Sequence, residues 1–162
     1  MKEKKLKRIE IHKVLFPGKK PNMKEVERYI VSFIKNEYVV EETYDVIRIG
    51  SRFASEYCGS LYTKKLKGAA LKAKANASSI IDKLIISATN RRWIENKDDK
   101  HINDAKLGWY RYDVFFSLPV SFAGEKSVNY YRATLIARIN DEGIFLHDMV
   151  NIKKEDSKPF ES

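Results

Sequence analysis

Cysteine is nearly absent from this sequence, since Cys58 is the one thiol among 162 residues. A single cysteine cannot form a disulfide within the chain, which excludes a disulfide scaffold and favours a reducing compartment, the cytoplasm. It also excludes zinc sites that are built on pairs of cysteines. We therefore interpret Cys58 as a small buried hydrophobic residue and not as a nucleophile.

Long apolar runs are absent as well. No segment approaches the roughly 20 consecutive apolar residues that a membrane-spanning helix needs. The N-terminus, MKEKKLKRIE, is basic, but no apolar stretch with a small-residue cleavage site follows it. The sequence therefore predicts neither a secretory signal nor a membrane partner. With 43% hydrophobic and 33% charged residues, the composition is typical of a globular protein.

Familiar catalytic motifs are also missing. The chain contains no glycine-rich phosphate loop, no serine–histidine–aspartate pattern and no spacing typical of metal ligands. These absences argue against P-loop, hydrolase-triad and zinc chemistry. We accordingly expect no cofactor and no metal ion.

The chain instead carries an excess of positive charge. It has 31 Lys and Arg residues against 22 Asp and Glu residues, a net charge of +9. Such a surface favours polyanionic partners, of which nucleic acid is the commonest, because Lys and Arg side chains neutralise phosphates. The alternative is a lysine-rich surface that is merely solvated, and the net charge does not distinguish the two.

Helices are predicted mainly in the first two thirds of the chain. Asn22 has the character of an N-cap with Glu25 three residues on, and apolar residues then recur at helical spacing. A second apolar stripe of small residues, flanked by lysines, runs from Leu61 to Ile86. A short polar segment before Gly108 completes the set. The predicted helices span about 22–37, 61–86 and 96–106.

Strands follow these helices. Period-two alternation sets in after Gly108, and short polar links at Gly124 and at Asp141–Gly143 predict hairpin turns. The predicted strands span about 109–119, 128–139 and 144–152, with 45–49 as a candidate edge strand. The expected fold is α+β, with N-terminal helices packed on one face of a mainly antiparallel four-stranded sheet that ends in a β-meander.

The expected organisation is one core domain with two appendages. The predicted parts are a basic N-terminal extension with one helix over residues 1–43, an α+β core over 44–155 and a flexible tail over 156–162.

Alternation also sorts the strand residues into two faces. One face is apolar and predicted to pack on the helices, and Tyr110 and Tyr112 are assigned to it. The other face is open, and arginines together with a hydroxyl and an aromatic ring there suit a phosphodiester. The alternative is a solvated face with cross-strand ion pairs. The open-face residues in question are Trp109, Arg111, Arg132, Thr134 and Arg138.

Histidine offers the best general acid–base candidate, and the chain has three. His101 opens HINDAKLGWYRYD and directly precedes a predicted strand, so it is expected at the edge of the sheet. His147 and His12 are weaker candidates, because His147 alternates with Asp148 and His12 lies in the extension. Asp148 itself interrupts an apolar strand face and therefore needs a partner if it is buried, either structural or catalytic.

Several stretches from about Val46 to Glu155 are similar to the large polyvalent protein-associated domains of phages and conjugative elements. Those domains resemble in turn the barnase–EndoU–colicin–RelE group of ribonuclease folds, with a helical part followed by a four-stranded antiparallel sheet. The matching stretches are IRIGSRFASEYCGS, YTKKLKGAALKAKANA, LIISATNRRWIENK, HINDAKLGWYRYDVFFSLPV, YRATLIARI and FLHDMVNIKKE.

The resemblance implies a metal-independent endoribonuclease, toxin-like, that cleaves through the ribose 2′-hydroxyl. His101 would then act as base or acid, and Tyr112 or Thr134 would position the substrate. Because no second histidine stands at an obvious partner position, a mechanism with two acid–base residues is not predicted. The nucleic-acid-binding residues would be Lys72, Lys74, Trp109, Arg111, Arg132 and Arg138.

The partners that follow are nucleic acid, RNA rather than DNA, and either an immunity protein or a parent polyvalent protein. The competing hypothesis is a non-catalytic nucleic-acid-binding or protein-interaction module of a mobile element. It predicts binding without cleavage.

Overall fold

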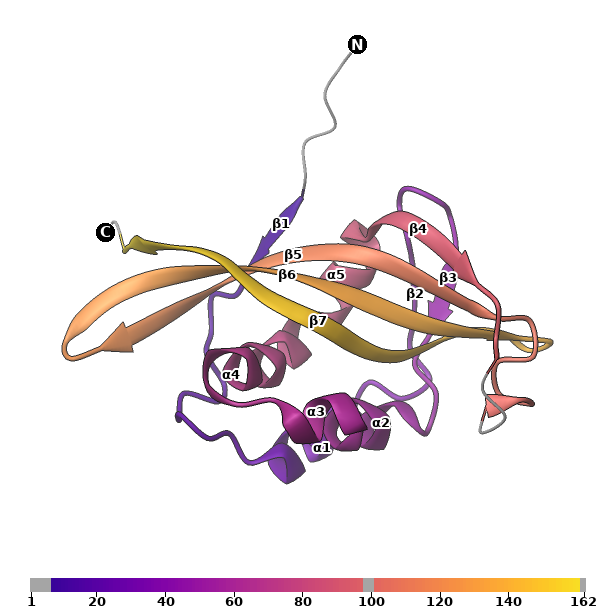
Figure 1. The fold of residues 1–162 in the computed structure, drawn as a ribbon, viewed down its shortest axis with the longest axis horizontal. Helices are drawn as coiled ribbons and strands as arrows, with labels where there is room; N and C mark the ends of the chain where they lie inside the picture. The colour runs from indigo at the N-terminus through magenta and orange to yellow at the C-terminus, as the bar shows by residue number, and fades with distance from the viewer. Residues whose placement is uncertain (1–6, 98–100, 161–162) are drawn as a thin grey trace, which may run out of the picture.

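A mixed, strongly curled sheet of seven strands carries the helices of this chain on one side (Figure 1). The computed structural model describes residues 7–97 and 101–160. The strand order is β1-β5-β6-β7-β3-β2, and β4 pairs with β5. The strands are β1 (Arg8–Glu10), β2 (Glu37–Val39), β3 (Val46–Arg48), β4 (Thr89–Ile94), β5 (Trp109–Phe122), β6 (Glu125–Asn140) and β7 (Gly143–Pro159). The helices are α1 (Met23–Val31), α2 (Phe53–Gly59), α3 (Leu61–Lys65), α4 (Gly68–Ala77), the 3₁₀ helix η1 (Ser78–Ile80) and α5 (Ile81–Ser87).

The predicted α+β class and the C-terminal meander are confirmed. β5, β6 and β7 pair antiparallel in sequence order, and each runs further than the alternation predicted. The β5–β6 turn has positive φ at both central residues, 51° at Ala123 and 82° at Gly124. This is the backbone that a two-residue hairpin prefers, because it matches the twist of the strands.

The predicted four-stranded, mainly antiparallel sheet is wrong. β1 pairs parallel with β5, and β3 pairs parallel with β7. β2 and β4 add further antiparallel neighbours. β3 lies within the predicted strand 45–49, but it is not at the edge of the sheet, because β7 pairs on one side of it and β2 on the other. β1 and β2 have three residues each, too few for a period-two pattern to stand out.

The predicted long helix over 61–86 is wrong as one element. It breaks at Gly68, whose φ of 60° follows an extended Leu66, and again at two serines. Ser78 and Ser79 donate their hydroxyls to the carbonyls of Ala75 and Asn76, which competes with continued helical bonding. The apolar stripe predicted over 61–86 continues through these breaks, because it reflects which residues are buried and not whether the helix is continuous.

Two further helix predictions need shortening. α1 begins as predicted, with the side chain of Asn22 accepting from the backbone N–H of Lys24, but it ends at Val31. Of the predicted helix 96–106, residues 98–100 lie outside the described residues, and 101–107 form turns that close with a bond from the Gly108 N–H to the Ala105 carbonyl.

The sheet curls until its opposite edges meet. Asp45, between β2 and β3, receives hydrogen bonds from Arg91 of β4 at 2.8 Å and from the Tyr112 hydroxyl of β5 at 2.7 Å. Nearby, Glu42 accepts from the Asn90 backbone N–H. Burial alone would raise the pKa of the Asp45 carboxyl, but the hydrogen bonds from Thr43, Tyr112 and Arg91 outweigh it and lower the pKa.

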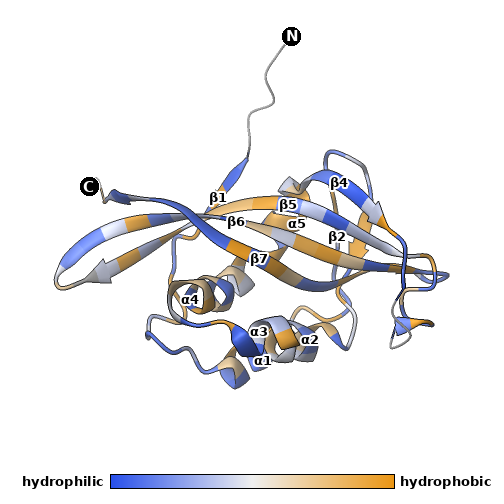
Figure 2. Ribbon diagram, viewed as in Figure 1, coloured by the Kyte–Doolittle hydropathy of each residue, from blue (hydrophilic) through white to orange (hydrophobic). Residues whose placement is uncertain are grey.

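The core lies between the helices and the concave face of β5–β7. Figure 2 shows the hydrophobic stretches of these strands over the helices, whereas the β5–β6 hairpin and the end of β7 are more hydrophilic. Tyr112 and Tyr131 are fully buried there, together with Tyr57 and Phe53 of α2. No helix among the described residues is long and apolar enough to span a membrane.

One ion pair is sealed inside this core. The Lys74 ammonium of α4 donates to Asp148 of β7 and to the Thr63 hydroxyl, both at 2.6 Å. Both charged side chains are almost completely buried. Burial lowers the pKa of Lys74, while the Asp148 carboxylate opposes that shift. Asp148, the polar residue in an otherwise apolar strand face, thus has Lys74 of α4 as its partner.

Candidate active site

Two histidines meet at one end of the sheet. His101 comes from the turns before β5, and His147 lies on β7. Their ring centroids are 5.2 Å apart and their planes nearly perpendicular. The indole of Trp109, at the start of β5, contacts both rings with centroid distances of 5.4 and 5.0 Å. Both imidazoles are mostly buried, with 16% and 17% of their side-chain surfaces exposed.

A β-bulge accounts for the position of His147. Ala137 of β6 pairs with Leu146, and the next pair joins Ile136 to Asp148, so His147 is the additional residue on β7. A bulge of this kind re-aims one side chain and is common beside active sites. Alternation along β7 placed His147 on the face opposite Asp148, and the structure agrees, since Asp148 is paired in the core and His147 lines the cavity with Trp109 and Arg111. Sequence reasoning nevertheless ranked His147 as a weak candidate, because nothing in the pattern placed it beside His101.

Each imidazole has a carboxylate beside its Nδ1 atom. The Nδ1 atom of His101 lies 3.5 Å from the Asp104 carboxylate, which Arg52 holds with two hydrogen bonds of 2.9 and 2.5 Å. The hydrogen bonds from Arg52 are the main reason that the pKa of Asp104 is lowered. Such a carboxylate favours the tautomer with the proton on Nδ1, which leaves Nε2 to exchange protons.

The carboxylate beside His147 comes from α2. Glu56 forms an ion pair with the Nδ1 atom of His147 and contacts Arg138 at 3.5 Å. The contact with His147 is close, but its geometry is not that of a hydrogen bond, and the Nδ1 atom is buried. We therefore treat Glu56 as a charged neighbour of His147 and not as its hydrogen-bond acceptor. Burial lowers the pKa of Arg138, and Glu56 partly compensates.

A cavity of about 570 Å³ opens at the histidine pair. Asn96 fixes its wall, because the Asn96 amide donates to the His101 carbonyl at 2.9 Å and accepts from the Trp109 indole at 3.3 Å. Two cationic residues, Lys97 and Arg111, are among its lining residues. The complete lining comprises Ile94, Glu95, Asn96, Lys97, His101, Trp109, Arg111, Ile136 and His147.

The structure brings together three of the residues predicted from the sequence: His101, Trp109 and Arg111 line this cavity. Arg138 is buried and does not line this cavity, but it contacts Glu56 at 3.5 Å and interacts electrostatically with Asp104. The assignment of Trp109 and Arg111 to the open face, and of Tyr110 and Tyr112 to the helix side, agrees with the structure.

The other predicted residues lie elsewhere. Lys74 is sealed in the core, and Tyr112 and Thr134 are buried, with the Tyr112 hydroxyl bound to Asp45. None of these three lines the histidine cavity, so the structure does not support the catalytic roles given to Tyr112 and Thr134 or the nucleic-acid contact given to Lys74. Arg132 is exposed on β6. Lys72 lines a different cavity, beside β5 and β6.

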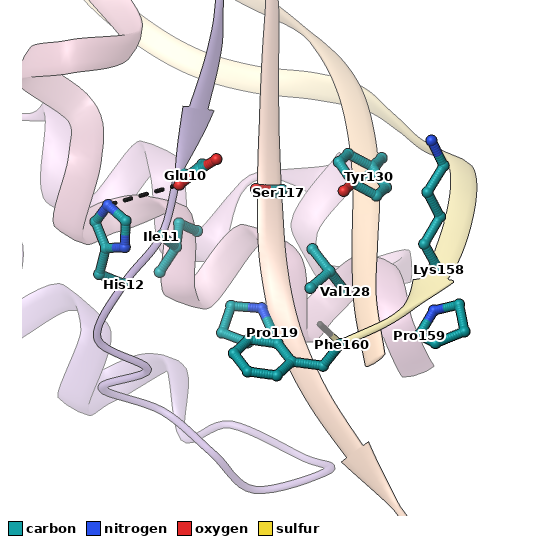
Figure 3. Close-up of a pocket in the computed structure, with 10 residues that line it drawn as sticks. All are labelled: Glu10, Ile11, His12, Ser117, Pro119, Val128, Tyr130, Lys158, Pro159 and Phe160. Atoms are coloured by element: carbon teal, nitrogen blue, oxygen red, sulfur yellow. Dashed lines mark ion pairs between the residues drawn. The ribbon is translucent and has the colours of Figure 1, made fainter. Parts of the chain in front are cut away.

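A larger cavity, of about 680 Å³, lies toward the other end of the sheet (Figure 3). His12 lies at its rim, 3.8 Å from Glu10, but its side chain is 79% exposed. We assign the candidate site to the smaller cavity, because two largely buried imidazoles with carboxylate partners are the stronger basis for acid–base chemistry.

No family model, curated protein or solved structure matches this chain. The resemblance to polyvalent-protein domains therefore stays a prediction, and the site is interpreted from its own geometry. Within residues 7–97 and 101–160, no group of three or more His, Cys, Asp or Glu side chains has the arrangement of a metal site.

Proposed function

We propose that this chain is a metal-independent endoribonuclease in which His101 and His147 are the acid–base pair. The observation that carries the proposal is the contact between two imidazoles, each with a carboxylate beside Nδ1, at a cavity with two cations. The resemblance inferred from the sequence implies the same chemistry, although it supplied one histidine rather than two.

In the proposed reaction, one imidazole takes the proton of the ribose 2′-hydroxyl while the 2′-oxygen attacks the adjacent phosphorus. The bond from phosphorus to the 5′-oxygen breaks, and the second imidazole, protonated, gives its proton to that oxygen. The products are a 2′,3′-cyclic phosphate and a 5′-hydroxyl. Arg111 and Lys97 stabilise the charge that builds up on the phosphate oxygens.

Each carboxylate occupies the Nδ1 side of one ring. Asp104 lies beside Nδ1 of His101 and Glu56 beside Nδ1 of His147, so that both Nε2 atoms serve as the exchanging positions. Trp109 packs against both rings and limits their rotation. Because the attacking group is the 2′-hydroxyl, the substrate is RNA, and DNA of the same sequence is not cut.

The test is cleavage of RNA in EDTA by the wild type and by three matched variants, one for each histidine of the chain. His101→Ala and His147→Ala should each lose about 100-fold or more in rate, the usual contribution of a general acid or base. His12→Ala is the control and should keep full activity, because His12 is exposed and lies at the other cavity.

The products and the pH dependence sharpen the test. Cyclic phosphate ends and a bell-shaped pH–rate profile are expected, since one imidazole must be neutral and the other protonated. Cleavage by His147→Ala at the wild-type rate would refute the paired mechanism. Binding of RNA without any cleavage by the wild type would support the competing hypothesis of a non-catalytic binding module.

A further inference from the structure

The open face of β5–β7 continues from the histidine cavity toward the cavity in Figure 3. Register pairs on this face join Arg111 to Ile136, Phe115 to Arg132 and Ser117 to Tyr130. Ser117 and Tyr130 line the second cavity. From Trp109 to Ser117 a strand advances by about 26 Å at roughly 3.3 Å per residue, a span of several nucleotides.

Cations gather at the far end of this face. Parallel pairing with β5 sets Arg8 of β1 beside Phe115, while β6 sets Arg132 on its other side. The Arg8 guanidinium lies 4.7 Å from the centre of the Tyr130 ring, and the Lys158 ammonium lies 5.4 Å from the same centre. The ring thus holds two cations in place, which lowers the entropic cost of binding an anion beside it.

Acidic residues also lie near these cations. Glu155 accepts from Arg8 at 3.2 Å, and Asp156 lies 4.0 Å from Lys158. Glu10 lines the second cavity and lies 3.8 Å from His12, while Asp113, nearer the histidines, accepts from Arg92 at 3.0 Å. At the far end, Glu155 therefore competes for the cation that an incoming phosphate would use. This competition supplies a second, opposite test of the site.

We propose that Arg8, Tyr130 and Lys158 form a distal phosphate site, and that the substrate is a single strand of RNA lying along the open face past Arg132. The inference rests on the proposed function for the position of the scissile bond. One row of cations follows one backbone, and the cavity must receive a phosphodiester with its 2′-hydroxyl, so an unpaired strand fits better than a duplex.

The test measures binding of an RNA of about twelve nucleotides with 2′-O-methyl groups, which cannot be cleaved, over a series of salt concentrations. The double variant Arg8→Gln, Lys158→Gln should lower the slope of log affinity against log salt by about 0.7, the contribution of one phosphate contact on a single strand, since both cations belong to one phosphate site. Glu155→Gln should tighten binding by freeing Arg8.

The matched control is Lys64→Gln, Lys65→Gln, which removes two exposed lysines from α3 on the helix side of the sheet. It should leave the slope nearly unchanged. Cleavage of a dinucleotide, too short to reach Tyr130, should be equal in the wild type and in Arg8→Gln, Lys158→Gln, while cleavage of the longer RNA should show a raised KM.

An unchanged slope in Arg8→Gln, Lys158→Gln would overturn the distal site, as would an equal loss in the α3 control. Binding that does not depend on salt would also overturn it. The binding result does not depend on catalysis, because the probe cannot be cleaved. If the double variant lowers the salt slope but the wild type does not cleave natural RNA, the nuclease proposal alone is refuted. If cleavage depends on the histidines but the double variant leaves the salt slope unchanged, the distal site alone is refuted.

Discussion

His147 and Asp148 are neighbours on β7, but they belong to two charged clusters with different access to solvent. Asp148 is paired with Lys74 inside the core, and neither side chain reaches the surface. His147 faces Glu56 and His101 at the wall of an open cavity. Both residues lie at the bulge between β6 and β7, where Asp148 contributes to stability and His147 to the proposed chemistry. Access, rather than charge, separates a structural ion pair from a candidate site.

The largest expected effect comes from breaking the sealed pair. Lys74→Met leaves the Asp148 carboxylate buried without its cation, which should lower the free energy of unfolding by about 3–5 kcal/mol. Urea denaturation measures this loss. The double variant Lys74→Met, Asp148→Leu should recover most of it, because an apolar pair of similar size can replace a buried ion pair. A double variant as unstable as the single one would contradict a purely structural role.

Gly108 should give the next largest effect, at the entrance to the histidine end of the sheet. Its φ is 98°, and a Cβ atom there would lie 2.5 Å from the Trp93 indole nitrogen and 2.8 Å from the Ile94 carbonyl oxygen. Gly108→Val should therefore cost about 1–3 kcal/mol of unfolding free energy. Gly59→Val is a suitable control for added bulk, since no atom lies within 4 Å of a Cβ there.

Glu56→Gln tests the cluster of His147, Glu56 and His101, where an effect on activity is expected. It removes the charge beside Nδ1 of His147 but keeps the size of the side chain. The expected result is a fall in kcat of at least about tenfold, or 1.4 kcal/mol in barrier, with a smaller change in KM. The unfolding midpoint should also fall, because the buried Arg138 loses its carboxylate partner, so kcat is compared well below that midpoint. An unchanged kcat would exclude a positioning role for Glu56.

The smallest effect concerns acid stability. Hydrogen bonds from Arg52 lower the pKa of Asp104 below the ordinary value of 3.8, so ionised Asp104 favours the folded state. This contribution is present above the unfolded pKa and is lost as pH falls through the lower folded value. Asp104→Asn should flatten the decline of stability below about pH 4, as followed by thermal unfolding across pH. Asp141→Asn, an exposed aspartate paired only with Lys106, is the control.

Local pattern was sufficient for the parts of this protein that depend on neighbouring residues. The alternation after Gly108 predicted β5, β6 and β7, the turn glycines predicted both hairpins, and Asn22 predicted the start of α1. The apolar and polar faces of β5 also followed from alternation, which correctly assigned Tyr112 to the core and Trp109 with Arg111 to the open side. In each case the determining interaction lies within a few residues of the pattern that reveals it.

The helix assignments were wrong where longer-range interactions decide. Among the predicted site residues, Lys74, Thr134 and Tyr112 have the chemistry of substrate contacts, but the packing of α4 and the curl of the sheet bury them. Lys74 is buried because Asp148 and Thr63 provide its hydrogen bonds, and no pattern in its own helix records those partners.

Residue pattern alone was enough for the α+β class, the C-terminal meander, the basic composition and the place of His101 at the entrance to the sheet. Folding was needed for the mixed topology and for the contact between His147 and His101, because β1 pairs with β5 far along the chain and the two histidines come from β7 and from the turns before β5. Contacts between residues so far apart in sequence leave no local pattern, which is why the proposed active site became visible in the folded chain.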